Sequence, residues 1–169
     1  MSSNNNDKQL ITNNDIKSND SIVEEKIIKV TGDYQIHRYI KGRLLGKGIK
    51  SKCYVFTSLE NKKIFAAKIT PKIGLIKTIA KQRLINEIKI HKSIHHPQIV
   101  TFDHYFEDTE NAYILLEFCG NQTLNELLKR RKHLTEIEGQ YNAYQIIQAL
   151  MYLHSHRVIH RGLKLENIY

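Results

Sequence analysis

Gly46 and Gly48 could bring backbone amides close to a phosphate, because neither residue carries a Cβ atom that would stand in the way. Lys68 ends a later apolar segment, where a lysine can reach phosphate groups, and Glu87 is spaced to pair with it. Each residue also has an ordinary explanation, since Gly-x-Gly occurs in plain hairpin turns and charged residues line most surface elements. Together these residues indicate a site for the phosphates of a nucleotide.

The elements that must position these residues are the strands and the helix of one α+β unit. Alternating apolar segments between polar turns predict five strands, over residues 39–45, 53–57, 64–69, 99–102 and 112–118. Gly46-Lys47-Gly48 is expected to form the tight turn after the first strand. A helix is expected over residues 79–93, because Leu84 and Ile88 recur at a spacing of four. The pattern predicts an antiparallel five-stranded sheet with one helix.

The regions on either side of this unit differ in composition. Residues 1–33 are rich in Asn, Ser, Asp and Lys, and they have too few apolar residues to offset the entropy of ordering. We therefore expect a disordered polar tail there, a compact unit over residues 34–118, and a helical region over residues 119–169.

Two capping boxes mark where helices begin in the last region, Thr123-x-x-Glu126 and Thr135-x-x-Glu138. The second box opens a long helix to about His156. This helix carries an apolar stripe that includes Ala143, Ile147, Leu150 and Met151.

Composition limits the classes of partner. The chain has 169 residues and a formal net charge of +9, but its lysines and arginines are scattered and no nucleic-acid-binding module is present, so we expect no nucleic-acid partner. The two cysteines, Cys53 and Cys119, lie far apart, which predicts reduced thiols and an intracellular protein. No apolar run approaches the length of a membrane span, so we expect no membrane insertion.

Several longer motifs support a family resemblance. They are Gly42-Arg43-x-Leu45-Gly46-Lys47-Gly48, Lys52-Cys53-Tyr54, Phe65-Ala66-x-Lys68-Ile69, Glu87-Ile88-x-Ile90-His91-Lys92-Ser93, Lys129-Arg130-Arg131-Lys132, and Tyr152-Leu153-His154 followed by Val158-Ile159-His160-Arg161. Through these motifs the chain from about Tyr39 to Tyr169 resembles the first half to two-thirds of a eukaryotic protein kinase domain, and within that family the polo-like kinases. The resemblance implies a kinase-like fold, with the small lobe followed by the first helices of the large lobe.

The same resemblance implies an ATP site in the small lobe. The residues that would cover the nucleotide are Leu45, Gly46, Lys47, Gly48, Ile49, Lys50, Ser51, Lys52 and Cys53. Lys68 would bind the phosphates and Glu87 would hold Lys68 in place. Leu116 would lie beside the adenine, whose edge would bond to the Glu117 carbonyl and the Cys119 amide.

The catalytic loop carries the main departure from the family. His160-Arg161-Gly162-Leu163-x-x-x-Asn167 matches the motif H-R-D-L-x-x-x-N except that Gly162 replaces the catalytic Asp. Lys164 would contact the γ-phosphate and Asn167 would hold Mg²⁺. The sequence given ends before any D-F-G, whose Asp would be the main Mg²⁺ ligand, so we expect Mg²⁺ to be held poorly. Ile49, Lys50 and Ser51 also replace the residues usual at the tip of the glycine-rich loop.

These departures decide the expected function. The sequence predicts an inactive, truncated polo-like Ser/Thr kinase with weak residual ATP binding. One alternative is a kinase-like binding module without catalysis, which docks a protein partner on the exposed helix of the large lobe. The others are a degenerate product without function and an active Ser/Thr kinase.

Overall fold

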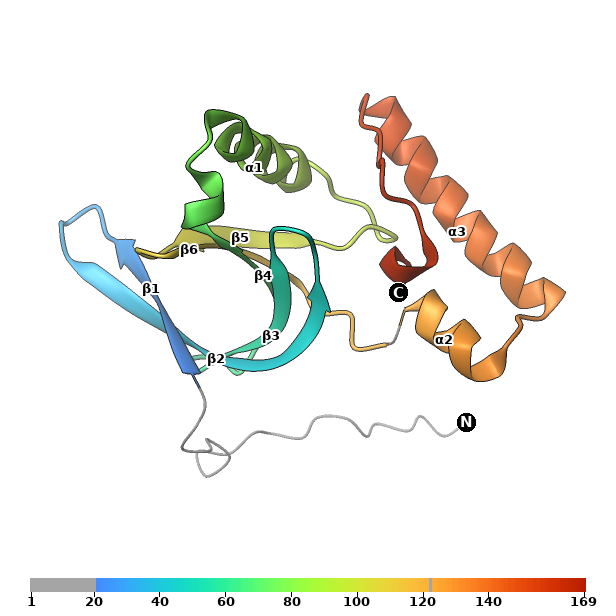
Figure 1. Cartoon of the computed structure of the whole chain (residues 1–169), viewed down its shortest axis with the longest axis horizontal. Helices are drawn as coiled ribbons and strands as arrows, with labels where there is room; N and C mark the ends of the chain where they lie inside the picture. The colour runs from blue at the N-terminus through green and yellow to red at the C-terminus, as the bar shows by residue number, and fades with distance from the viewer. Residues whose placement is uncertain (1–20, 122) are drawn as a thin grey trace.

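The computed structural model describes residues 21–121 and 123–169, which form one curled antiparallel sheet, a helix against it and a second, helical region (Figure 1). The strands are β1 (Ser21–Ile28), β2 (Tyr34–Lys47), β3 (Lys52–Ser58), β4 (Ile64–Pro71), β5 (Phe102–Glu107) and β6 (Asn111–Glu117). The helices are α1 (Thr78–Lys92), α2 (Leu124–Arg131) and α3 (Glu136–Ser155), with short 3₁₀ turns η2 (Lys72–Leu75) and η3 (Leu165–Asn167). The strands lie in the order β1-β2-β3-β4-β6-β5.

Strand β1 corrects the prediction of a disordered tail over residues 1–33 and adds a sixth strand to the five expected. Residues 1–20 of that tail lie outside the described part of the chain. The strand pairs with β2 along its whole length, from Ser21 opposite Lys41 to Ile28 opposite Tyr34. Its central carboxylate, Glu25, is buried and accepts a hydrogen bond from the Tyr39 hydroxyl at 2.8 Å. The polar composition of this segment was misleading, because the polar side chain of Glu25 is buried and hydrogen-bonded inside the fold.

An aromatic core lies within the curl of the sheet. Its buried members are Tyr39, Phe56, Phe65, Ala67, Ile69, Phe106, Tyr113 and Leu115. Phe106 and Tyr113 stack with ring centroids 4.6 Å apart, and Phe56 is fully buried. Because side chains alternate across a strand, one face of the sheet supplies this core and leaves the other face for a helix.

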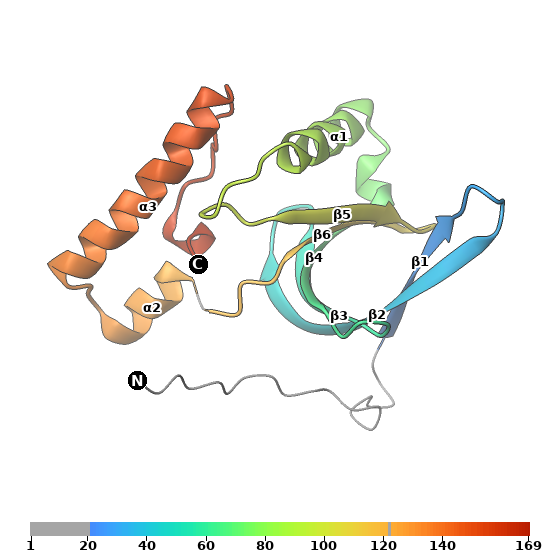
Figure 2. The same cartoon turned by 180° about the vertical axis from the view of Figure 1, so that it is seen from behind.

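Helix α1 covers that other face of the sheet, as both views of the ribbon show (Figures 1 and 2). Leu84 is the buried residue of the helix and packs in one cluster with Ala112 and Ile114 of β6. The helix matches the predicted range of 79–93 to within one residue at each end. Lys92 ends it, and the chain then turns through His95 and His96.

The strand expected at residues 99–102 begins later, at Phe102. The Ile99 amide donates to the His96 carbonyl at 3.0 Å, so Pro97 and its neighbours form a turn, and Ile99 cannot pair as a strand. Strand β5 runs instead to Glu107 and pairs with β6. The other predicted strands are confirmed, with ends that differ by a few residues.

Both capping boxes are confirmed. The Thr123 hydroxyl accepts from the Glu126 amide at 3.3 Å, and the Glu126 carboxylate accepts from the Thr123 amide at 3.0 Å. The same reciprocal pair joins Thr135 and Glu138 at the start of α3. These bonds satisfy backbone donors that a helix otherwise leaves free in its first turn.

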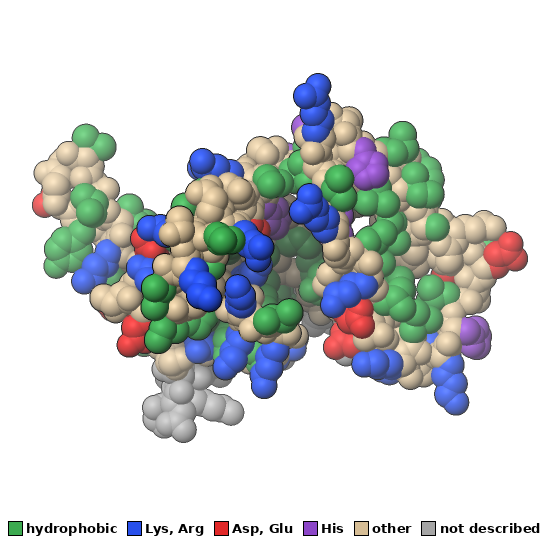
Figure 3. Space-filling model, turned by 45° about the horizontal axis from the view of Figure 1, so that its top comes forward, with side chains coloured by type: hydrophobic (Ala, Val, Ile, Leu, Met, Phe, Trp, Pro, Cys, Tyr) green, Lys and Arg blue, Asp and Glu red, His purple; other side chains and the backbone are tan. Residues whose placement is uncertain are grey.

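Helix α3 buries Leu153 but leaves a broad apolar stripe exposed. The large residues of this exposed α3 face are Ile137, Tyr141, Tyr144, Ile147 and Met151, which are 52–79% exposed. Hydrophobic side chains are visible over this helical region in Figure 3. None of the helices within residues 21–121 and 123–169 is both long and apolar enough to cross a membrane.

Candidate functional site

The glycine-rich turn joins β2 to β3. Gly46 lies opposite Cys53 and Lys47 opposite Lys52, so both residues belong to β2, and the tight turn expected at residues 46–48 spans residues 48–51 instead. It closes where the Gly48 amide donates to the Ser51 carbonyl at 2.8 Å. A Cβ atom at Gly48 would lie 3.3 Å from the Ser51 hydroxyl, whereas nothing lies within 4 Å of one at Gly46. The turn is therefore tight at Gly48 and open above Gly46, where a phosphate would need room.

The tip of this turn carries the residues that depart from the family pattern. Ile49 is fully exposed, and Lys50 is exposed beside it. Leu45 and Lys47, the preceding residues of β2, are exposed as well. These side chains present positive charge and apolar surface to solvent rather than packing on the sheet.

Lys68 and Glu87 form the predicted ion pair between β4 and α1. The strand register sets the position of the lysine, since Lys68 lies opposite Cys53 on β3 and Ile114 on β6. The side chain of Lys68 is 32% exposed and that of Glu87 is 45% exposed. An ion pair this exposed adds little stability.

The segment after β6 joins the two regions of the molecule. Leu116 and Glu117 end the strand, and the Glu117 amide donates to the Thr101 carbonyl at 2.9 Å. Burial raises the pKa of the Cys119 thiol, and Glu117 raises it further. Burial also raises the pKa of the Cys53 thiol, although Lys68 opposes that shift. Both thiols are therefore protonated near neutral pH.

Tyr169 is a member of this site that the sequence analysis missed. Partial burial raises the pKa of its hydroxyl, and the nearby Cys53 and Cys119 thiols add to the shift. The Tyr169 side chain lines one cavity together with Glu117, Cys119 and Asn167. The sequence feature that could have indicated Tyr169 is an aromatic residue two positions after Asn167.

The loop from His160 to Asn167 is closed by its own side chains. The Asn167 amide nitrogen donates to the Gly162 carbonyl at 2.7 Å. This bond directs the nitrogen to the loop, and the Asn167 amide oxygen takes no part in it. Lys164 directly precedes η3 and is exposed. The loop is joined to α2, because the Leu124 amide donates to the Ile168 carbonyl at 2.7 Å.

Gly162 has space for a Cβ atom. A Cβ atom there would meet its nearest neighbour, the Asn167 amide nitrogen, at 3.7 Å, and its backbone lies outside the left-handed region. Glycine is therefore not required at this position by the backbone or by packing. Neither the local backbone conformation nor the local packing therefore explains why a carboxylate is absent at position 162.

A cavity of about 560 Å³ lies next to these residues, between α1, the 94–100 segment, α3 and the loop. Glu87, Glu117, Cys119, Asn167 and Tyr169 all contribute to its lining. Lys68 and the glycine-rich turn do not. The cavity therefore adjoins the predicted phosphate site, and its lining is mainly apolar, with residues from α1, the 94–100 segment and the helical region.

Comparison with known proteins identifies the family. The model of the protein kinase domain matches residues 39–169. The chain is 59% identical over 148 residues to the maize (Zea mays) protein named "Probable serine/threonine-protein kinase CCRP1", covering 88% of this chain and 24% of that one. It is 44% identical over 161 residues to "Probable serine/threonine-protein kinase PLK" of Dictyostelium discoideum, covering 95% and 16%. It is 48% identical over 131 residues to "Serine/threonine-protein kinase polo" of Drosophila melanogaster, covering 78% and 23%.

The chain belongs to the protein kinase family and has polo-like Ser/Thr kinases among its relatives. The fold agrees, since the curled sheet with α1 is a kinase small lobe and α2 and α3 begin the large lobe. The chain spans less than a quarter of the length of these curated relatives.

Proposed function

We propose that this chain is a polo-like member of the Ser/Thr protein kinase family that does not catalyse phosphoryl transfer and binds ATP weakly. One observation carries the proposal: Gly162 stands in the catalytic loop where the family motif has its Asp. That Asp accepts the proton of the substrate hydroxyl. A positioned general base contributes about 10²–10⁴-fold to the rate, and glycine has no group to replace it.

Weak nucleotide binding is supported by the geometry of the small lobe. The Lys68–Glu87 pair is formed, and the space above Gly46 is open. The fit to Mg²⁺ is poor within this chain, because Asn167 offers one oxygen whereas Mg²⁺ requires a near-octahedral set of ligands. Binding of ATP would therefore depend on the lysine and on backbone amides more than on the metal.

The test places residues 39–169 in the corresponding segment of the Drosophila polo kinase and measures phosphorylation of casein. Three versions of the chimera are compared, with Gly162, Gly162→Asp and Gly162→Asn. The Asp version restores the carboxylate, and the Asn version matches its size without the base. A Lys68→Met substitution in the Asp version sets the background.

We expect the Gly162 and Gly162→Asn chimeras to be at least about 100-fold slower than the Gly162→Asp chimera. If the Gly162 chimera works within about tenfold of the Asp version, the proposed loss of activity is wrong. The comparison is matched in size, because Asp and Asn add the same number of heavy atoms at a position where a Cβ atom meets no neighbour closer than 3.7 Å.

A second candidate is a binding module, and the exposed α3 face favours it. Isolated exposed apolar side chains are common, whereas a contiguous stripe of large residues is typical of interaction surfaces, and this supports the candidate. The partner that fits is a helical segment with a complementary apolar stripe, of the kind that packs on a helix in the large lobe. This role is compatible with the loss of phosphoryl transfer.

A further inference from the structure

The exposed α3 face is symmetric about its central residue. Its five large exposed residues are Ile137, Tyr141, Tyr144, Ile147 and Met151. An α-helix turns by about 100° per residue, so the other four lie within about 60° of the direction of Tyr144 around the helix. Ile137 and Met151 stand seven residues before and after Tyr144, and Tyr141 and Ile147 stand three residues before and after it. The same pattern is therefore met when the helix is followed in either direction.

The opposite side of α3 packs on the rest of the molecule. Leu153 follows Tyr144 by nine residues, which places it about 180° around the helix, and it is buried. Ile146, Ala149 and Leu150 line the cavity of about 560 Å³. Helix α3 stands at the outer edge of the helical region in both ribbon views (Figures 1 and 2). The exposed α3 face is thus directed to solvent and is free to meet another molecule.

The absence of charge on this face limits the kind of partner. From Gly139 to Leu153 the sequence has no Asp, Glu, Lys, Arg or His. The polar residues nearest the stripe are Gln140 and Gln148, which stand four residues before and after Tyr144. Nucleic acids and anionic membranes attract lysine and arginine, so a neutral face favours another neutral, apolar protein face instead.

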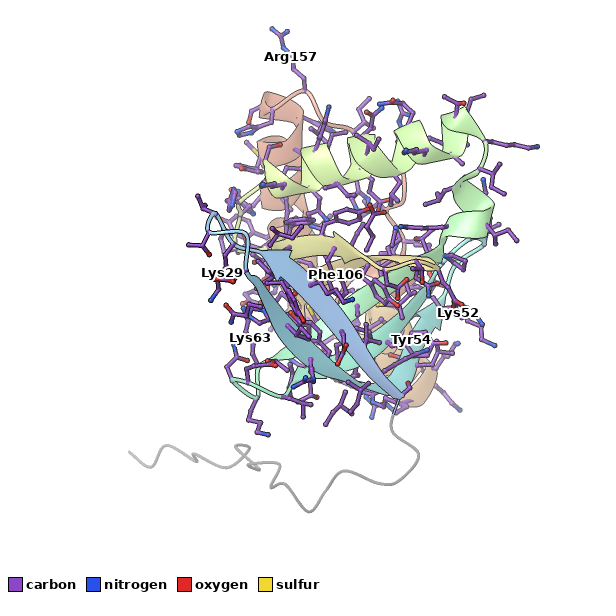
Figure 4. The ribbon with its side chains drawn as sticks, turned by 90° about the vertical axis from the view of Figure 1, so that its left-hand side faces the viewer. Lys29, Lys52, Tyr54, Lys63, Phe106 and Arg157 are labelled. Carbon is purple, nitrogen blue, oxygen red and sulfur yellow. The ribbon has the colours of Figure 1, made fainter. Side chains whose placement is uncertain are left out.

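The two ends of α3 differ in charge. Glu136 and Glu138 lie in the first turn, whereas His154 lies in the last turn. Arg157 follows the helix and extends beyond its end in Figure 4. If two such helices lie side by side in opposite directions, the acidic start of each lies near the basic end of the other. Parallel helices would instead bring the acidic ends together, which is unfavourable.

We propose that the exposed α3 face pairs with the same face of a second copy of this chain, with the two helices antiparallel and a two-fold axis at Tyr144. In that register Ile137 of one copy lies opposite Met151 of the other, and Tyr141 lies opposite Ile147. Tyr144 lies opposite its own copy. The inference rests on the binding-module candidate described above and gives that module its partner.

The polar residues fit the same register. Gln140 of one copy lies opposite Gln148 of the other, and each amide group both donates and accepts hydrogen bonds. A two-fold interface uses the same surface on both copies, so the assembly stops at the dimer. One helix pair makes a small interface, and we expect weak association, with a Kd of about 10–100 µM. In dilute solution the chain is then a monomer with this face exposed.

The test is sedimentation equilibrium of the full chain from about 1 to about 500 µM, without nucleotide. We expect a monomer that converts to a dimer across this range. A chain that remains monomeric throughout would overturn the proposal. The loss of phosphoryl transfer is measured separately in the polo chimera, so either result can fail without the other.

Substitution of Tyr144 tests the two-fold axis. Tyr144→Glu and Tyr144→Lys each bring two like charges together, and each should weaken pairing at least about tenfold. An equimolar mixture of the two variants should form a dimer again, because opposite charges then meet. Tyr34→Glu is the matched control, since Tyr34 is 68% exposed on β2 and Tyr144 is 63% exposed. Undiminished pairing of Tyr144→Glu, or a mixture that stays monomeric, would refute the proposed axis.

A measurement on the unsubstituted chain tests the register without any variant. Ile137 and Met151 are 14 residues apart on one helix, a separation of about 21 Å that is too long for a nuclear Overhauser effect. In a concentrated mixture of isotope-labelled and unlabelled chains, we expect this effect between their methyl groups across the interface. Its absence from a dimeric sample, or an effect between the two copies of Ile137, would overturn the antiparallel pairing.

Discussion

The Asn167 side chain donates a hydrogen bond of 2.7 Å to the carbonyl of Gly162, so the catalytic-type loop is closed without a carboxylate at position 162. The loop keeps its shape through an amide that reaches back to the backbone. The change from Asp to Gly at this position therefore removes a reactive group and leaves the frame around it in place.

Substitution of two glycines should give opposite results. Gly162→Ala adds a Cβ atom whose nearest neighbour would lie at 3.7 Å, on a backbone that alanine readily adopts, so we expect no loss or a gain of about 0.4–1 kcal/mol. Gly32→Ala places alanine at φ +87° in the turn between β1 and β2, and we expect a loss of about 1 kcal/mol or more. Urea unfolding of the full chain measures both. Equal destabilisation by the two substitutions would contradict this view of the loop.

ATP binding should depend on Lys68 more than on Mg²⁺. We expect Lys68→Met to weaken binding of a fluorescent ATP analogue by about tenfold, because a charge-assisted contact to phosphate is lost. Lys81→Met, at an exposed lysine of α1, is the matched control and should bind like the unsubstituted chain. Titrations with and without Mg²⁺ complete the measurement. A strong dependence on Mg²⁺ would show a metal site that Asn167 alone does not explain.

Two aliphatic residues on α3 should differ sharply in their effect on stability. Leu153 is 5% exposed, and its replacement by alanine should cost about 2–5 kcal/mol. Ile147 on the exposed α3 face is 52% exposed, and Ile147→Ala should change stability by no more than about 0.5 kcal/mol. Thermal unfolding compares the two variants. A large loss from Ile147→Ala in the isolated chain would mean that the stripe is covered, for example by a second copy.

The start of α3 should resist acid. A side-chain hydrogen bond from Arg131, with further bonds from Thr135, lowers the pKa of Glu138 from 4.5 to about 2. A lowered pKa in the fold contributes stability above the unfolded value of 4.5, and that contribution is lost as the pH falls through about 2. Carboxyl-carbon NMR should place the titration of Glu138 there. In Arg131→Gln the titration should move upward, and an unchanged titration would contradict the assigned cause.

Motifs with local geometry were predictable from the sequence. The capping boxes at Thr123 and Thr135 each need only two residues three positions apart, and both form. The Lys68–Glu87 pair was predictable for a different reason, since the resemblance to protein kinases implies that Glu87 holds Lys68, and the pair forms.

Features that depend on distant partners were not predictable. Strand β1 contains Glu24, Glu25 and Lys26 in a row, and such a run indicates a solvated tail. The partners of the buried Glu25 are Tyr39 in the next strand and His104 in β5, at the other edge of the sheet. No local sequence pattern therefore predicts its burial. Tyr169 likewise meets a distant part of the chain, since it lines one cavity with Cys119, which lies 50 residues earlier.

The positions of the cysteines have a practical consequence for labelling. Cys53 and Cys119 are the only two cysteines in the sequence, and both border the candidate nucleotide site. Every fluorophore or spin label attached through a thiol will therefore report from that site, without the need to remove other cysteines first. Because burial raises the pKa of both thiols, labelling will be slow near neutral pH, and a nucleotide that covers them should slow it further.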